Sequence, residues 1–144
     1  MRKFQIFLIV FLIIGCSYKS TKSSSSSYNG IPYIEFCDLP KNEGKLIYIK
    51  AVYSGIDEYF AINSQKKCTV DLHVEFDCYV DGNPIPKKFE NEFNSVHSSY
   101  WNKYLIIEAT GKYESKNPRG YGHLGSNKSR FILDEIISVK IIEK

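Results

Sequence analysis

Hydrophobic and polar positions follow three different patterns along the 144 residues of the chain. Residues 4–14 are almost entirely apolar and follow a basic pair. Residues 17–30 are polar and rich in serine, with no hydrophobic period. From residue 31 onward, apolar residues alternate with polar ones or recur at helical spacing. The patterns divide the chain into a signal peptide (residues 1–15), a flexible tether (16–30) and one folded domain (31–144).

Strict alternation of apolar and polar residues is clearest from residue 69 to residue 80. The apolar members of this series are Val70, Leu72, Val74, Phe76, Cys78 and Val80. Alternation of this length predicts one half-buried strand, with Cys78 on its inner face and His73 pointing outward.

Four further segments have the composition and alternation of strands: residues 46–53, 58–62, 103–113 and 131–142. The first two are close together and predict a hairpin. Asp134-Glu135 interrupts the alternation of the last segment, which favours a β-bulge there. Residues 88–101 instead carry apolar side chains at helical spacing, at Phe89, Phe93, Val96 and Tyr100, and predict an amphipathic helix.

The N-terminal run is too short to span a bilayer, which needs about 20 apolar residues. A basic start, an apolar run and a small residue before a cut are typical of a secretory signal. Its end, Ile13-Ile14-Gly15-Cys16, resembles the lipobox of bacterial lipoproteins. The resemblance implies cleavage before Cys16 and acylation of Cys16, with fatty chains such as palmitate. The alternatives are an uncleaved anchor, or an ordinary secretory leader whose Cys16 is incidental.

The predicted order of three strands, a helix and two strands matches an OB-fold, a five-stranded Greek-key barrel. Short stretches resemble small bacterial OB-fold lipoproteins of unassigned function. These are Cys37-Asp38-Leu39, Gly44-Lys45-Leu46, Cys68 and Gly122-His123-Leu124-Gly125. We therefore expect a mainly β fold with one helix, an OB-fold-like barrel. An open α+β sandwich would use the same elements and is the alternative.

Three cysteines follow Cys16, an odd number for an exported chain. If residues 69–77 form one extended strand, Cys68 and Cys78 lie about 33 Å apart, too far for a disulfide. Cys37 precedes the first strand and Cys68 follows the second, and these ends meet in an antiparallel hairpin. We therefore expect a Cys37–Cys68 disulfide, with Cys78 as a buried thiol.

The loop around residues 119–126 (RGYGHLGS) is the main candidate for ligand binding. Its glycines permit close approach of a ligand to the backbone, and Tyr121 and His123 can stack or donate hydrogen bonds. The alternative is that the glycines serve tight turns and His123 caps the end of the barrel. His73 and His97 are expected on polar faces, and no histidine or cysteine spacing suggests a metal site.

Motifs of nucleophilic, phosphate-binding and zinc-protease sites are absent from the sequence, so we expect neither an enzyme nor a cofactor. The formal charge of +3 falls to nearly neutral once the basic pair of the leader is removed, which gives no reason to expect nucleic acid as a partner. We expect a lipoprotein of the cell membrane or outer membrane, held by acylated Cys16 and facing the periplasm or the exterior. Its predicted role is a binding module for a glycan, peptide or small polar ligand. The alternative is a structural or protein-interaction lipoprotein.

Overall fold

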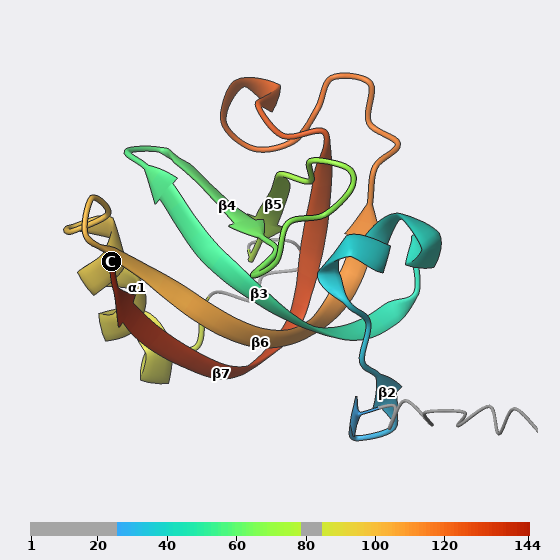
Figure 1. Cartoon of the computed structure of the whole chain (residues 1–144), viewed down its shortest axis with the longest axis horizontal. Coiled ribbons are helices and arrows are strands. Elements are labelled where there is room, and N and C mark those ends of the chain that lie inside the picture. The colour runs from blue at the N-terminus through green and yellow to red at the C-terminus, as the bar shows by residue number, and fades with distance from the viewer. Residues whose placement is uncertain (1–25, 79–84) are drawn as a thin grey trace, which may run out of the picture.

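Five strands close into a barrel in the computed structural model, which describes residues 26–78 and 85–144 (Figure 1). The strands are β3 (Leu46–Ile56), β4 (Tyr59–Asn63), β5 (Val74–Asp77), β6 (Lys103–Glu114) and β7 (Ser129–Glu143). Their order around the barrel is β3-β4-β5-β7-β6, and β6 pairs back onto β3. Neighbouring strands are antiparallel except β5 and β7, which are parallel. The predicted mainly β, OB-fold-like class is confirmed, and a closed barrel replaces the alternative open sandwich.

Alternating side chains of β3 and β6 form the centre of the core. Every second residue along the predicted parts of these two strands is buried: Ile47, Ile49, Ala51, Tyr53, Leu105, Ile107 and Ala109. β3 continues past its predicted end to Ile56, and the two-residue turn of the hairpin is Asp57-Glu58. Gly55 therefore lies inside the strand, where the backbone and ring of Phe60 leave no room for a β-carbon.

The long strands β6 and β7 change register twice along their shared ladder. Thr110 pairs with Glu135 and Gly111 pairs with Leu133, so Asp134 is left without a partner residue in the ladder. The side chain of Asp134 instead accepts a hydrogen bond of 2.8 Å from the Thr110 hydroxyl. This confirms the bulge expected at Asp134-Glu135, and bulges bend a strand in the way that barrel closure requires.

The strand predicted for residues 69–80 is much shorter, and this prediction was wrong in its extent. Only Val74–Asp77 form β5, while residues 69–73 are irregular and Val70 is 62% exposed. Residues 79 and 80 lie outside the described residues. The cause is a lack of neighbours: β4 ends at Asn63, opposite residue 73, and β7 begins at Ser129, opposite Val74. Residues 69–73 alternate in polarity but have no strand beside them to complete a ladder.

One α-helix covers an end of the barrel beside β6 and β7 (Figure 1). α1 spans Glu90–His97, after the 3-10 turn η3 (Lys87–Phe89), and buries Phe93 and Val96. The predicted helix over residues 88–101 is thus too long at its C-terminal end. Ser98 ends it, because its hydroxyl donates to the carbonyls of Asn94 and Ser95 and competes with the helical pattern.

A disulfide joins Cys37 and Cys68, as predicted, with their Cα atoms 5.4 Å apart. Cys37 lies in the 3-10 helix η1 (Phe36–Asn42), which packs on β3 and β6. Among the described residues Cys78 is a free, buried thiol, and burial raises its pKa to about 11. A thiol with that pKa is protonated and unreactive at neutral pH.

Before the barrel lies a two-stranded hairpin, β1 (Ser27–Tyr28) and β2 (Ile31–Pro32). This hairpin lies partly within the segment expected to be a tether, and the ring of Tyr28 packs 6.1 Å from that of Tyr48 on the barrel. In Figure 1 this hairpin extends below the barrel, far from the loop that joins β6 to β7 at the top. Within residues 26–78 and 85–144, no helix has the length and hydropathy needed to cross a membrane.

Candidate functional site

A hollow of about 320 Å³ lies on the outer surface of the barrel, between the β3–β4 hairpin and the loop that joins β6 to β7. We call it the hairpin groove. Its described lining residues are Ser54, Gly55, Ile56, Tyr59, Ala61, Asn63, His73, Ser126 and Asn127. In OB-folds these two connections commonly border a binding face. The sequence predicted the contribution of the loop, which supplies Ser126, but gave no signal for Asn63 or Asn127.

His123 does not line the hairpin groove, but it contacts Tyr59, which does, and so links the loop to the hairpin. It begins the 3-10 turn η4 (His123–Gly125), and its Nδ1 lies 3.3 Å from Oε2 of Glu58 in the hairpin turn. Its ring also meets the ring of Tyr59 edge to face, with centroids 5.1 Å apart. His123 therefore contacts the hairpin turn rather than the buried core, and Tyr59 remains 50% exposed beside it.

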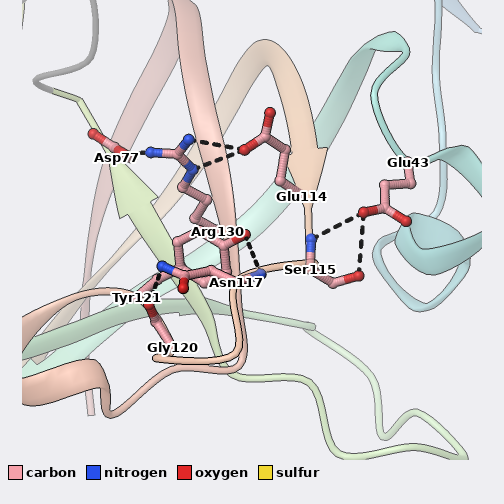
Figure 2. Close-up of polar contacts among 8 residues, drawn as sticks. All are labelled: Glu43, Asp77, Glu114, Ser115, Asn117, Gly120, Tyr121 and Arg130. Carbon is pink, nitrogen blue, oxygen red and sulfur yellow. Dashed lines mark hydrogen bonds and ion pairs between the residues drawn. The ribbon is translucent and has the colours of Figure 1, made fainter.

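Tyr121, the second predicted ligand-binding residue, anchors the loop and does not line the hairpin groove (Figure 2). Its hydroxyl accepts a hydrogen bond of 3.1 Å from the backbone N–H of Asn117, and its ring lies 5.2 Å below the guanidinium of Arg130. The structure thus separates the two residues that the sequence grouped together. Tyr121 instead borders a smaller hollow of about 280 Å³, with Glu43, Gly44, Glu114 and Lys116.

Arg130 holds three strands together at the base of the loop (Figure 2). Its Nε and Nη2 both donate to Oε2 of Glu114 on β6, at 3.0 and 2.8 Å. Its Nη1 donates to Oδ2 of Asp77 on β5, at 2.9 Å. On the far side of β6, the N–H of Ser115 donates to Glu43 at 3.2 Å. The start and end of the loop are therefore both fixed by charged hydrogen bonds.

Beneath the loop, Asn127 is buried and donates a hydrogen bond of 2.7 Å from its Nδ2 to Oε2 of Glu75 on β5. Burial raises the pKa of Glu75, while the hydrogen bond from Asn127 opposes the rise. Gly122 lies against the same carboxylate, with a φ of +71°. The loop therefore rests on the Glu75 side chain, which fixes one wall of the hairpin groove.

The other two histidines lie in different surroundings. His73 lines the hairpin groove, exposed and 3.4 Å from Asp71, but it precedes β5 instead of lying on it. His97 was predicted on the polar side of the helix, yet its Nε2 lies 2.7 Å from the hydroxyl of Tyr53. Its ring packs 4.4 Å from that of Phe60, and burial lowers its pKa. The sequence could not find this contact, because it depends on where the helix meets the barrel.

The aromatic side chains outside the core that the structure describes are dispersed and do not form one stacking platform. Tyr48 packs against Tyr28 and Tyr33. Burial is the main cause that raises the pKa of Tyr48 to about 12, and its hydrogen bond to Glu108 is the second. Tyr100 and Trp101 contact each other after α1. Tyr79 lies outside the described residues. Of these aromatic residues, Tyr59 alone lines the hairpin groove among the residues that the structure describes.

In the two described ranges, no group of three or more His, Cys, Asp or Glu side chains is placed to hold a metal ion. The geometry supports hydrogen bonding and ring contact with a ligand. No family model, curated protein or solved structure matches the chain.

Proposed function

We propose that this chain is a lipoprotein of the cell envelope, anchored to the cell membrane or outer membrane by acylated Cys16. Its barrel is a non-enzymatic binding module for a glycan, a peptide or a small polar ligand. The ligand lies in the hairpin groove, where Tyr59 and His123 contact it. Tyr121 contributes indirectly, because it anchors the loop that carries His123.

The observation that carries this proposal is the composition of the hairpin groove. It combines an exposed aromatic ring, that of Tyr59, with hydrogen-bonding side chains from β4 and from the loop, notably Asn63 and Asn127. Binding sites for small ligands usually combine apolar surface with a few fixed polar groups, in volumes upwards of about 300 Å³. The Asn127–Glu75 hydrogen bond and the Arg130 network hold the wall in place before a ligand arrives.

The position of the N-terminal hairpin agrees with a tethered module. Figure 1 shows β2 below the barrel and the loop between β6 and β7 above it. A chain that leaves the barrel at Ser27 towards a lipid anchor therefore starts far from the loop that borders the groove. The groove stays open to the surroundings while the protein is held at the membrane.

A structural or protein-interaction role is the second candidate, and two exposed apolar side chains favour it. Ile56 is 63% exposed at the hairpin turn and Leu124 is 86% exposed in the loop. Leu124 also has a φ of +54°, a strained value for a leucine. On this hypothesis both side chains are covered by an envelope protein.

Crosslinking in intact envelopes, followed by pull-down of the full-length chain, tests the first candidate. Tyr59→Ala and His123→Ala should each reduce capture of the ligand, whereas Trp101→Ala, which changes an exposed aromatic ring outside the groove, should not. Capture that depends on Ile56 and Leu124 but not on Tyr59 would support the protein-interaction role. Capture unaffected by all of these changes would contradict both.

A further inference from the structure

A second hollow lies directly beside the hairpin groove. It has a volume of about 300 Å³ and lies on the outer face of β3 and β6. Its described lining residues are Val52, Ser54, Ser64, Gln65, Tyr104, Ile106 and Lys144. Ser54 lines both hollows, and Asn63 of the hairpin groove is the chain neighbour of Ser64 in the second. We call the second hollow the sheet groove. Because Ser54 lines both, the two hollows adjoin at Ser54 on β3, and we refer to the pair as the depression.

The side chains along this depression are mostly uncharged hydrogen-bonding groups. They are Ser54, Asn63, Ser64, Gln65, Ser126 and Asn127, with one tyrosine in each hollow, Tyr59 and Tyr104. No aspartate or glutamate belongs to the described lining of either hollow. The lining cation Lys144 donates from Nζ to the carbonyl of Tyr100 at 2.9 Å. His73 lies 3.4 Å from Asp71. A charged ligand group would therefore find few charged partners in these two hollows. Binding sites for anions, by contrast, usually supply charged hydrogen-bond donors.

We propose that the two hollows together bind a linear, uncharged oligosaccharide, which runs from Tyr59 across Ser54 to Tyr104. This inference rests on the proposed function and names its ligand class. Hydroxyl and acetamido groups of such sugars match serine, asparagine and glutamine side chains, which both donate and accept hydrogen bonds. The apolar faces of the sugar rings match the tyrosine rings, which combine an apolar surface with a polar end.

The floor of the depression argues against an extended peptide as the ligand. Peptides commonly bind barrels and sheets by adding a strand at a free edge. β3, which carries Val52 and Ser54, is paired with β4 on one side and β6 on the other. It therefore presents side chains, and not free backbone groups, to whatever lies above it. A ligand that bonds through many hydroxyl groups uses such a surface better than one that bonds through its backbone.

The test uses the full-length chain in detergent micelles and an array of uncharged linear oligosaccharides from disaccharide to octasaccharide, built from hexoses or N-acetylhexosamines. Acidic oligosaccharides and peptides serve as comparison probes. We expect longer uncharged chains to bind more tightly than disaccharides. Tyr104→Ala should weaken binding of the long chains roughly fivefold to tenfold. Tyr59→Ala should weaken both short and long chains.

Gln65→Ala provides a second variant of the sheet groove, since Gln65 is exposed and its loss leaves the barrel core intact. It should also weaken long-chain binding, by roughly threefold to tenfold. Lys67→Ala is the matched control, because Lys67 is exposed in the same loop but does not line the sheet groove. Binding that does not depend on length, or is unchanged by both Tyr104→Ala and Gln65→Ala, would overturn the proposal.

These measurements separate the oligosaccharide inference from the proposed binding function. If only acidic oligosaccharides or peptides bind, and Tyr59→Ala abolishes that binding, the uncharged-glycan inference is wrong and the proposed binding function stands. If no probe binds, or if Tyr59→Ala and His123→Ala leave all binding unchanged, the proposed function of the hairpin groove is wrong as well.

Discussion

Gly122 lies directly against the carboxylate of Glu75, so closely that a β-carbon built on the glycine would overlap Oε2. The same Oε2 accepts the hydrogen bond from Asn127. The loop between β6 and β7 therefore meets β5 through one carboxylate held between a glycine and an amide. This contact decides how far the loop stands from the sheet, and with it the width of the hairpin groove.

Gly122→Ala should destabilise the protein by about 2 kcal/mol. About half comes from placing a β-carbon at a φ of +71°, and the rest from displacing Glu75 and losing its hydrogen bond with Asn127. Gly44→Ala is the matched control: its φ is +73°, but nothing lies within 4 Å of the added carbon. It should cost about 1 kcal/mol. Urea unfolding measures the loss of stability in both variants. Equal losses would show that the Glu75 side chain moves aside at no cost.

The Cys37–Cys68 disulfide should contribute about 3–4 kcal/mol, because it closes a separation of 31 residues in the unfolded chain. The double variant Cys37→Ser/Cys68→Ser should lose this amount in urea unfolding. Reductant should destabilise the natural chain and leave the double variant unchanged. A double variant as stable as the natural chain would contradict the prediction.

Thiol labelling separates Cys78 from the disulfide. In the folded protein burial and a pKa of about 11 should keep Cys78 unlabelled. Unfolding without reductant should expose Cys78 to the reagent while sparing Cys37 and Cys68. Labelling of either of those two before reduction would contradict the pairing.

Stability should fall as the pH drops from 7 towards 5, because of His97. Burial lowers its pKa in the folded state, so below its ordinary pKa the unfolded chain binds the proton more readily than the folded one. The stability that neutral His97 contributes is fully present above the ordinary histidine pKa of about 6.5. It is lost as the pH falls below that value towards 5. His97→Gln should flatten this part of the stability profile in urea unfolding across the same pH range.

Most of the barrel could be predicted from local sequence, because β3 and β6 bury every second residue and lie between two paired strands. The extent of β5 could not be predicted. Polar and apolar residues alternate in residues 69–73 just as they do in residues 74–77. The difference is that only residues 74–77 have strands beside them, and the alternation of a segment carries no information about its neighbours. The Cys37–Cys68 disulfide was predicted correctly although the extended strand used to exclude Cys68–Cys78 is not formed over its full length, because the two ends of the hairpin do meet.

The candidate site was predicted in part for a related reason. Glycine content marked the loop, and His123 does reach the hairpin. Tyr121 has the same composition signal but lies under Arg130, a residue of β7 that only the fold brings over its ring. Asn127 and Gln65 face grooves formed by three or more segments distant in sequence, so their roles could not be read from any local pattern.

Cys16→Ser should abolish acylation and release the protein from membranes. A serine hydroxyl cannot form the thioether that the lipobox resemblance implies, and stable anchoring needs at least two fatty chains. Detergent phase partitioning and intact-mass measurement of the mature chain test this directly. Unchanged partitioning, or an unmodified N-terminus on the natural protein, would contradict the lipid anchor and leave the barrel as it is.

Arg130→Lys should loosen the loop although it keeps the positive charge. Arg130 makes two hydrogen bonds to one oxygen of Glu114 and a third to Asp77, and a lysine ammonium on its flexible stem cannot reproduce this planar fork. The Arg130–Asp77 and Arg130–Glu114 ion pairs are half-buried, so the substitution should lower the free energy of unfolding by about 1–3 kcal/mol.

Because Arg130 also covers the ring of Tyr121, the substitution should raise hydrogen exchange in the loop more than in β3. Lys50→Arg serves as the control, since it exchanges the same two residue types at the Lys50–Glu108 pair on the outer sheet, away from the loop. If Arg130→Lys and Lys50→Arg change loop exchange equally little, the loop is held by its backbone turns alone. The geometry of the hairpin groove would then depend on Gly122 and Asn127 rather than on the charged network at its base.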